Sequence, residues 1–265
     1  MMRDNSPPSS VSLSVSNWSA WAPSVSDQTA WQNWAKEGTL LSGVVDSGGT
    51  DPDVKFVAPM MRRRLSRLSR MAFRAATDCL DGTEASPSFV FCSRYGEYAR
   101  GFGILQGLSN GEAVSAAAFS MSVHNTATSL YSIETKDQSA STALAGGEAT
   151  LEVGFIEAWS LLVNGAADSV LLICHDERLP DLYRDQQTTV AHDSAFAMLL
   201  RRPEDDSDGI ALDLEWTAQR PDGPVKEFAV DPPLQVLQLL LAGDGSFVLD
   251  TGRLIWTWRS GLDAD

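Results

Sequence analysis

The sequence is poor in the residues from which nucleophilic and metal centres are usually built. Its 265 residues include only three cysteines and three histidines, and neither type recurs at metal-ligand spacing. No G-x-S-x-G, G-x-G-x-x-G or G-x-x-x-x-G-K-[ST] motif is present. These absences argue against a metalloenzyme, a serine hydrolase and a phosphate-cradling or dinucleotide-binding protein. We therefore expect neither a metal nor a cofactor.

Basic residues are also scarce. The chain has 20 Lys and Arg against 35 Asp and Glu, a net charge of −15. Nucleic acids and anionic membranes attract cationic surfaces, so both are disfavoured as partners. No run approaches the roughly 20 apolar residues that span a bilayer, and no apolar segment follows Arg3 as in a secretory signal. With Cys79, Cys92 and Cys174 interpreted as reduced, buried thiols, these features predict a cytoplasmic protein.

What the sequence does contain is apolar patterning. A hydrophobic content of 43% in a chain of this length can supply one large core. The alternation VSLSVSNWSAWAP predicts a strand from about residue 10, and WQNWAKEGT a short helix. Gly, Asp and Pro gather in 42–58, which predicts a loop, and apolar residues spaced by three and four predict one amphipathic helix over 59–82.

Predicted strands and helices then alternate. Segments 88–93, 169–177 and 194–203 read as strands, 98–111 as a helix and 132–141 as a polar connection. Segment 142–165 predicts a strand-to-helix elbow at two glycines and a buried helix. The uninterrupted apolar run of 169–177 is typical of a strand buried on both faces, which favours an α/β architecture.

The tail differs in pattern. After the acidic segment 204–209 come IALDLEWTA, an amphipathic helix DPPLQVLQLLLAG and the strands SFVLDT and RLIWTWRS. We therefore divide the chain into an N-terminal segment 1–15, a main domain 16–203 and an extension 204–265 that packs on the same core. The eight tryptophans fit core packing, and an aromatic-rich protein interface is the alternative.

The order of these elements resembles the N-terminal half of a β-ketoacyl synthase of the thiolase fold. In that family an Asn followed by small residues and Ser-Ile precedes the elbow; here this is NTATSLYSI, from Asn125 to Ile133. The Gly that ends the elbow helix and the Asp that opens the next strand correspond to Gly165 and Asp168. The resemblance covers roughly residues 20–200. It implies a truncated thiolase-like layered α/β/α domain with a small C-terminal α+β extension.

The resemblance puts Glu148, with Gly147 before it, where the family has its acyl-accepting cysteine. A carboxylate suits the first turn of a helix, because it faces the positive end of the helix dipole, but it cannot form an acyl-enzyme. The simpler interpretation is that Glu148 is such a first-turn acid. The alternative is that Glu148 reaches into a pocket of a partner protein or pairs with a cation across an interface. The family's C-terminal motifs with the catalytic histidines have no counterpart in this sequence.

The resemblance therefore implies a catalytically silent subunit. It is similar to the chain-length factors, which pair with an active ketosynthase to elongate an acyl chain bound to an acyl carrier protein, as in aryl polyene and type II polyketide systems. Two rivals remain open. One is an independent acyl-thioester enzyme, such as a malonyl decarboxylase, that uses Glu148 with His124. The other is a homodimeric acyl-binding scaffold.

Other residues carry weaker signals. His124 and Asn125 are candidates for a pocket or a subunit interface, although a satisfied core histidine is the commoner explanation for a residue such as His124. His175 ends an apolar strand and His192 lies in a polar stretch, so we interpret them as a loop-stabilising and a surface residue. The predicted helix 59–82 carries a cationic stripe, which is either an ion-paired face or a dock for an acidic carrier protein. The docking candidates are Arg62, Arg63, Arg64, Arg67 and Arg70.

Overall fold

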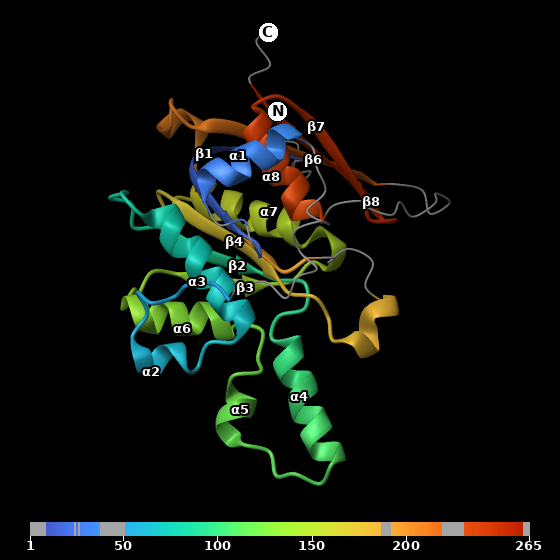
Figure 1. Cartoon of the computed structure of the whole chain (residues 1–265). Helices are drawn as coiled ribbons and strands as arrows, with labels where there is room; N and C mark the ends of the chain where they lie inside the picture. Colours follow the sequence, from blue (N-terminus) through green and yellow to red (C-terminus); the bar gives the residue numbers. More distant parts are fainter. Residues whose placement is uncertain are drawn as a thin grey trace, which may run out of the picture.

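A computed structural model describes residues 9–23, 25, 27–37, 51–186, 192–218 and 231–261, with the backbone alone for 184–186. The predicted segment 1–15 and loop 42–58 lie partly outside these ranges. The described strands form one eight-stranded sheet in the order β3-β2-β4-β5-β1-β6-β8-β7 (Figure 1). Strands β3, β2 and β4 run parallel, and every other neighbouring pair is antiparallel.

The strands follow the apolar runs of the sequence. Both central strands β4 and β5 are buried almost throughout, as their uninterrupted apolar sequences predict. The alternating N-terminal strand β1 lies in the middle of the sheet, between β5 and β6. The bounds are β1 Ser10–Trp21, β2 Ser88–Cys92, β3 Ser141–Leu144, β4 Val170–Asp176, β5 Ser194–Arg201, β6 Ile210–Ala218, β7 Gly245–Asp250 and β8 Leu254–Ser260.

Helices cover both faces of the sheet. One hydrophobic cluster joins the sheet to α3 and α6, and a second, on the opposite face, joins it to α1, α7 and α8 (Figure 1). This is the layered α/β/α arrangement that the sequence predicts. The helices are α1 Gln28–Glu37, α2 Pro59–Arg62, α3 Arg67–Leu80, α4 Tyr98–Ser109, α5 Ala116–Ser120, α6 Thr126–Thr135, α7 Thr150–Val163 and α8 Pro232–Ala242. Within the described residues, none of these helices has the length and apolar character needed to cross a bilayer.

The prediction of one helix over 59–82 is wrong. The chain forms the short α2, a turn, and then α3, because the Ser66 side chain accepts a hydrogen bond from the Ser69 backbone N–H at 2.9 Å and starts a new helix. Leu65 is buried in the turn. The predicted polar connection 132–141 is also wrong in its first part, since α6 runs to Thr135.

Helices α4 and α5 project from the body between β2 and α6 (Figure 1). No residue of α4 or α5 is buried. Several large apolar side chains on this excursion are exposed, including Leu105 at 61% and Phe119 at 63%. Residues 98–123 thus form a helical excursion from the body of the protein.

The tail continues the sheet beyond β1. Strand β6 pairs with β1, and β8 and β7 follow it outward. Trp258 on β8 stands edge-on to Phe155 on α7, with ring centroids 4.8 Å apart. The tail and the elbow helix therefore share one hydrophobic cluster.

Candidate functional site

The elbow between β3 and α7 is built on its two glycines. Gly147 has φ +64°, a left-handed conformation that favours glycine. A Cβ on Gly146 would lie 2.8 Å from both the Ala149 carbonyl oxygen and a Val153 methyl group. One 3₁₀ turn, Gly147–Ala149, then leads into α7. The strand-to-helix elbow is formed as the sequence predicts.

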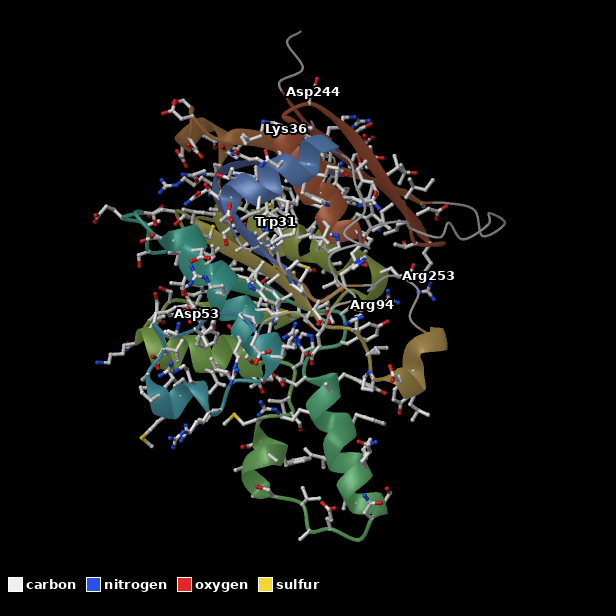
Figure 2. All side chains as sticks on the ribbon, in the orientation of Figure 1. Trp31, Lys36, Asp53, Arg94, Asp244 and Arg253 are labelled. Atoms are coloured by element: carbon white, nitrogen blue, oxygen red, sulfur yellow. The ribbon has the colours of Figure 1, made fainter. Side chains whose placement is uncertain are left out.

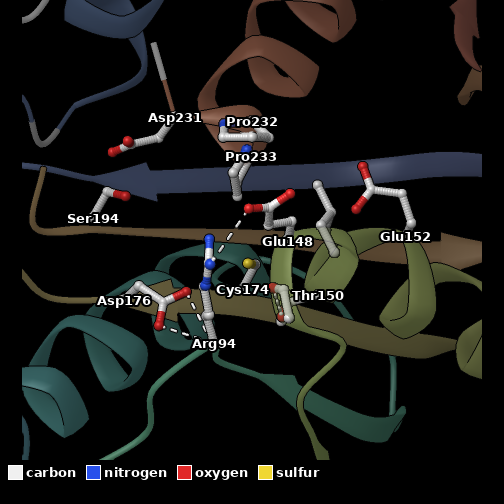
Figure 3. Close-up of a pocket in the computed structure, with 12 residues that line it drawn as sticks. Arg94, Glu148, Thr150, Glu152, Cys174, Asp176, Ser194, Asp231, Pro232 and Pro233 are labelled. Atoms are coloured by element: carbon white, nitrogen blue, oxygen red, sulfur yellow. Dashed lines mark hydrogen bonds and ion pairs between the residues drawn. The ribbon is translucent and has the colours of Figure 1, made fainter. Parts of the chain in front are cut away.

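Glu148 stands on this turn, and its partner is an arginine of the same chain. An Arg94 Nη2 atom lies 3.6 Å from Glu148 Oε1, as the dashed line in Figure 3 shows. Both side chains are mostly covered, with 24% of Glu148 and 16% of Arg94 exposed. Arg94 comes two residues after β2, so the ion pair joins the ends of two neighbouring strands.

Asp176, at the end of β4, holds the segment that carries Arg94. Its carboxylate accepts hydrogen bonds from Ser93 Oγ at 2.8 Å and from the Arg94 backbone N–H at 2.9 Å. Burial raises the pKa of Asp176 to about 6, and the hydrogen bonds from Arg94 and Ser93 oppose that rise. Asp176 thus fixes the backbone from which Arg94 reaches Glu148.

A cavity of about 30 Å³ lies between the elbow, the ends of β2 and β4, and the start of α8. Glu148, Arg94 and Asp176 line it, together with Glu152 from α7 and Asp231 before α8 (Figure 3). That volume holds one or two water molecules and is far too small for an acyl chain. Among the residues described, no group of three potential ligands is arranged to hold a metal ion.

His124 lies on the other side of the Arg94 segment. Its Nε2 atom is 2.8 Å from the Ser93 carbonyl oxygen, and it lines a second pocket of about 410 Å³ against α4. Asn125, at the start of α6, is exposed and makes no side-chain capping bond. The structure therefore brings Gly147 and Glu148 into one site and puts His124 in a neighbouring pocket, while Asn125 lines neither of these two pockets.

The other two histidines are buried or paired. His175 is buried in β4, and burial, with His124 nearby, lowers its pKa to about 4. His192 Nδ1 lies 3.2 Å from Asp231 Oδ2. His192 is thus mostly covered rather than the surface residue that the sequence suggested.

The five candidate arginines fall into two groups. Arg67 pairs with Asp51 at 2.6 Å and with Asp193 at 3.2 Å, and Arg70 pairs with Asp51 at 3.2 Å. Within the part of the chain that is described, the other group has no ion pair. It consists of Arg62 on α2 and of Arg63 and Arg64 in the exposed turn that follows.

Sequence reasoning missed Arg94, Asp176 and Glu152. Arg94 and Asp176 each follow or end a buried apolar strand, which is a usable signal, because side chains at neighbouring strand ends meet at one sheet edge. Glu152 is four residues after Glu148 and interrupts the apolar stripe of α7. A charged residue at a core position of a helix was the available signal there.

Comparison with known proteins fits this geometry. Residues 31–259 match the family model described as beta-ketoacyl synthase, N-terminal domain. The ketosynthase ApeO in complex with its chain length factor ApeC, from Xenorhabdus doucetiae, contains a chain that is 27% identical, with a TM-score of 0.77 over 94% of this chain and 99% of that one. The ishigamide ketosynthase/chain length factor gives 13% identity and a TM-score of 0.73 over 95% and 99%. No curated protein matches this chain.

The fold and the elbow define a thiolase-like α/β domain of the ketosynthase type. The chain belongs to the β-ketoacyl synthase N-terminal domain family, because the family model covers most of its length. It also resembles a β-ketoacyl synthase from Burkholderia phymatum, at 14% identity and a TM-score of 0.60 over 80% of this chain but 66% of that one. The resemblance inferred from the sequence is confirmed.

Proposed function

We propose that this chain is a non-catalytic, chain-length-factor-like subunit that pairs with an active β-ketoacyl synthase during elongation of a carrier-bound acyl chain. The main support is the share of each relative's length that this chain covers. The chain covers 99% of the chain it resembles in the ApeO–ApeC complex, but only 66% of the Burkholderia ketosynthase and 43% of a polyketide ketosynthase domain. The chain and that relative therefore correspond over nearly the whole length of the relative.

The elbow chemistry supports catalytic silence. A ketosynthase needs a thiolate at the helix N-terminus, and this chain has a carboxylate that is paired with Arg94. Its three cysteines are all buried, and burial raises the pKa of Cys79 to about 12. In the described residues, the cavity beside Glu148 gives an acyl group no room.

The exposed apolar surface supports a protein partner. Leu105, Leu108, Phe119 and Val123 on the helical excursion are exposed. Leu105 and Phe119 line one groove of the excursion, and exposed apolar surface of this kind commonly marks a protein interface. Strand β3, which leads into the elbow, is an edge strand, since no other described strand pairs with its outer side, and such an edge can pair with a strand of another chain.

A carrier protein is the second proposed partner. The exposed Arg63 and Arg64 lie beside Met60, whose side chain is 77% exposed. A cationic rim next to an apolar side chain is complementary to an acidic amphipathic helix, and complementary charge speeds encounter. Because Arg67 and Arg70 are already paired within the chain, the turn after α2 is the stronger docking candidate.

The test is to produce the chain with and without the ketosynthase encoded beside it. Molar mass from light scattering and malonyl-dependent elongation are then measured for the chain, for the ketosynthase and for the mixture. We expect a one-to-one complex that elongates only when both subunits are present. Turnover by the chain alone would overturn the proposal in favour of a carboxylate-based enzyme, and a stable homodimer that ignores the ketosynthase would favour a scaffold.

A further inference from the structure

Glu152 is a fully buried carboxyl group in the first turn of the elbow helix α7. Its Oε1 atom accepts a hydrogen bond from Trp258 Nε1 on β8 at 2.8 Å. Its Oε2 atom is equally buried and has no hydrogen-bond partner among the described residues. A buried carboxylate with one free oxygen is costly, whereas the neutral acid is far cheaper to bury.

Glu152 stands in the first turn of α7, so the positive end of the helix dipole partly favours its ionised form. In the described chain no cationic side chain is within ion-pair distance of it, and the nearest arginine in the cavity, Arg94, is paired with Glu148. The adjoining strands contribute the neutral thiols Cys92 and Cys174. The remaining ionisable groups at the cavity are acids, Asp176 at the end of β4 and Asp231 before α8. Neither of these acids supplies a positive charge to Glu152.

The contact that Glu152 makes joins two distant parts of the chain. Trp258 belongs to the tail, and its ring packs against Phe155 one turn further along α7. Trp258 and Phe155 are both completely buried. The Glu152–Trp258 hydrogen bond is therefore the polar link inside an otherwise apolar contact between the elbow helix and the C-terminal hairpin.

We propose that Glu152 is a proton-controlled lock between α7 and β8: it holds the two together as a neutral acid, and when ionised it draws water into the elbow cavity and loosens the contact. The cavity supplies the space, because it borders Glu152 and admits one or two waters. It also supplies the path by which the released proton reaches solvent water. The lock belongs to this chain alone and does not depend on the proposed function.

Burial raises the pKa of Glu152 to about 7, and the bond from Trp258 opposes the rise. A carboxyl whose pKa is higher in the folded state stabilises the fold fully below its ordinary pKa of about 4.5 and loses that contribution as pH rises through about 7. Near pH 6, folding therefore binds close to one more proton than it would without this side chain.

The decisive measurement is the ¹³C titration of the Glu152 carboxyl carbon in the full chain, together with the pH dependence of urea unfolding. We expect the carboxyl group to titrate with a midpoint near pH 7. We also expect the urea concentration at the unfolding midpoint to decrease as the pH is raised from about 5 to about 8. Glu152→Gln keeps the acceptor for Trp258 and should flatten part of that pH dependence. Trp258→Phe removes the donor and should shift the carboxyl midpoint upward.

Glu157→Gln is the matched control, because it removes the same charge from a less buried position of α7. In Glu157→Gln the urea concentration at the unfolding midpoint should depend on pH as it does in the unmodified chain. Asp176 and Glu177 also have raised pKa values, so some pH dependence must survive in Glu152→Gln. A carboxyl that titrates at its ordinary value, or equal pH dependence in Glu152→Gln and the unmodified chain, would overturn the lock.

Discussion

The five residues between β2 and α4, 93–97, connect the two candidate pockets. Ser93 Oγ donates to Asp176 and accepts from the Gly96 backbone N–H at 2.8 Å. Gly96 has φ +56°, and a Cβ there would lie 2.8 Å from the His124 ring. The turn that presents Arg94 to the elbow therefore also presses against His124, so the two sites share one support.

Gly96→Ala should be destabilising for two reasons, the left-handed backbone and the clash with His124. We expect a loss of about 2 kcal/mol in the free energy of unfolding, measured by urea denaturation. Gly101→Ala is the control, since it lies inside α4 with nothing within 4 Å of the added Cβ. Helix propensity predicts that this change is neutral or stabilising by up to about 1 kcal/mol. Equal effects at both positions would show that the turn carries no strain.

At the scale of elements, the break between α2 and α3 separates the arginines. Helix α3 holds Arg67 and Arg70 in ion pairs, whereas the turn before it leaves Arg63 and Arg64 exposed. A carrier protein that uses this region should therefore depend on the turn. The helix itself contributes stability through its pairs with Asp51.

Reversing charge in the turn should weaken carrier-protein binding. For Arg63→Glu combined with Arg64→Glu we expect at least a tenfold loss of affinity, mainly in the association rate, with the difference shrinking at high salt. Surface plasmon resonance on the assembled complex would measure it. Arg253→Glu, on an exposed site remote from α2 (Figure 2), is the matched control. An unchanged association rate in the double variant would remove the turn as a dock.

How much the sequence predicts differs between elements. The strands were predictable because an apolar run such as SVLLICHDE fits little else than a buried strand. The helix break was not, because Leu65 and Leu68 keep the helical spacing through the turn. The cause of the break includes a tertiary contact: Ser66 Oγ and Ser69 Oγ both donate to the buried Glu97, at 2.6 and 2.8 Å. Nothing local in the sequence indicates that pairing.

The residues of the candidate site also differ in whether the sequence predicts them. The elbow and Glu148 follow from local signals, two glycines ahead of an apolar helix and the count back from Gly165. The partner Arg94 does not, since its distance to Glu148 depends on how β2, β3 and β4 are ordered in the sheet. The assignment of Glu148, Gly147, His124 and Asn125 as functional residues stays a prediction.

On the scale of the whole molecule, the buried and the exposed apolar surfaces are sharply separated. Clusters on both sheet faces are closed by helices and by the tail. The helical excursion projects from the body (Figure 1), and it leaves Leu105 and Phe119 largely in solvent. A chain that covers its core this completely and still exposes an apolar helix pair is suited to association.

Leu105→Glu combined with Phe119→Glu should abolish pairing with the ketosynthase while the chain stays folded, because neither side chain contributes to the core. We expect at least a hundredfold weaker complex by light scattering and titration, and unchanged circular dichroism. Val248→Glu, on the exposed side of β7, is the control and should pair normally. Normal pairing of the double variant would assign the interface to another face.

The position of β1 has a consequence for how the chain folds. The first strand in sequence fills the middle of the sheet, and Ser16 bonds to the Leu199 carbonyl oxygen 183 positions later. During synthesis β1 must therefore wait for most of the chain before either of its neighbours exists. Contacts of such long range close slowly and leave apolar strand surface open meanwhile. Newly made chains should accordingly depend on chaperones, and refolding from urea should be slow and sensitive to protein concentration.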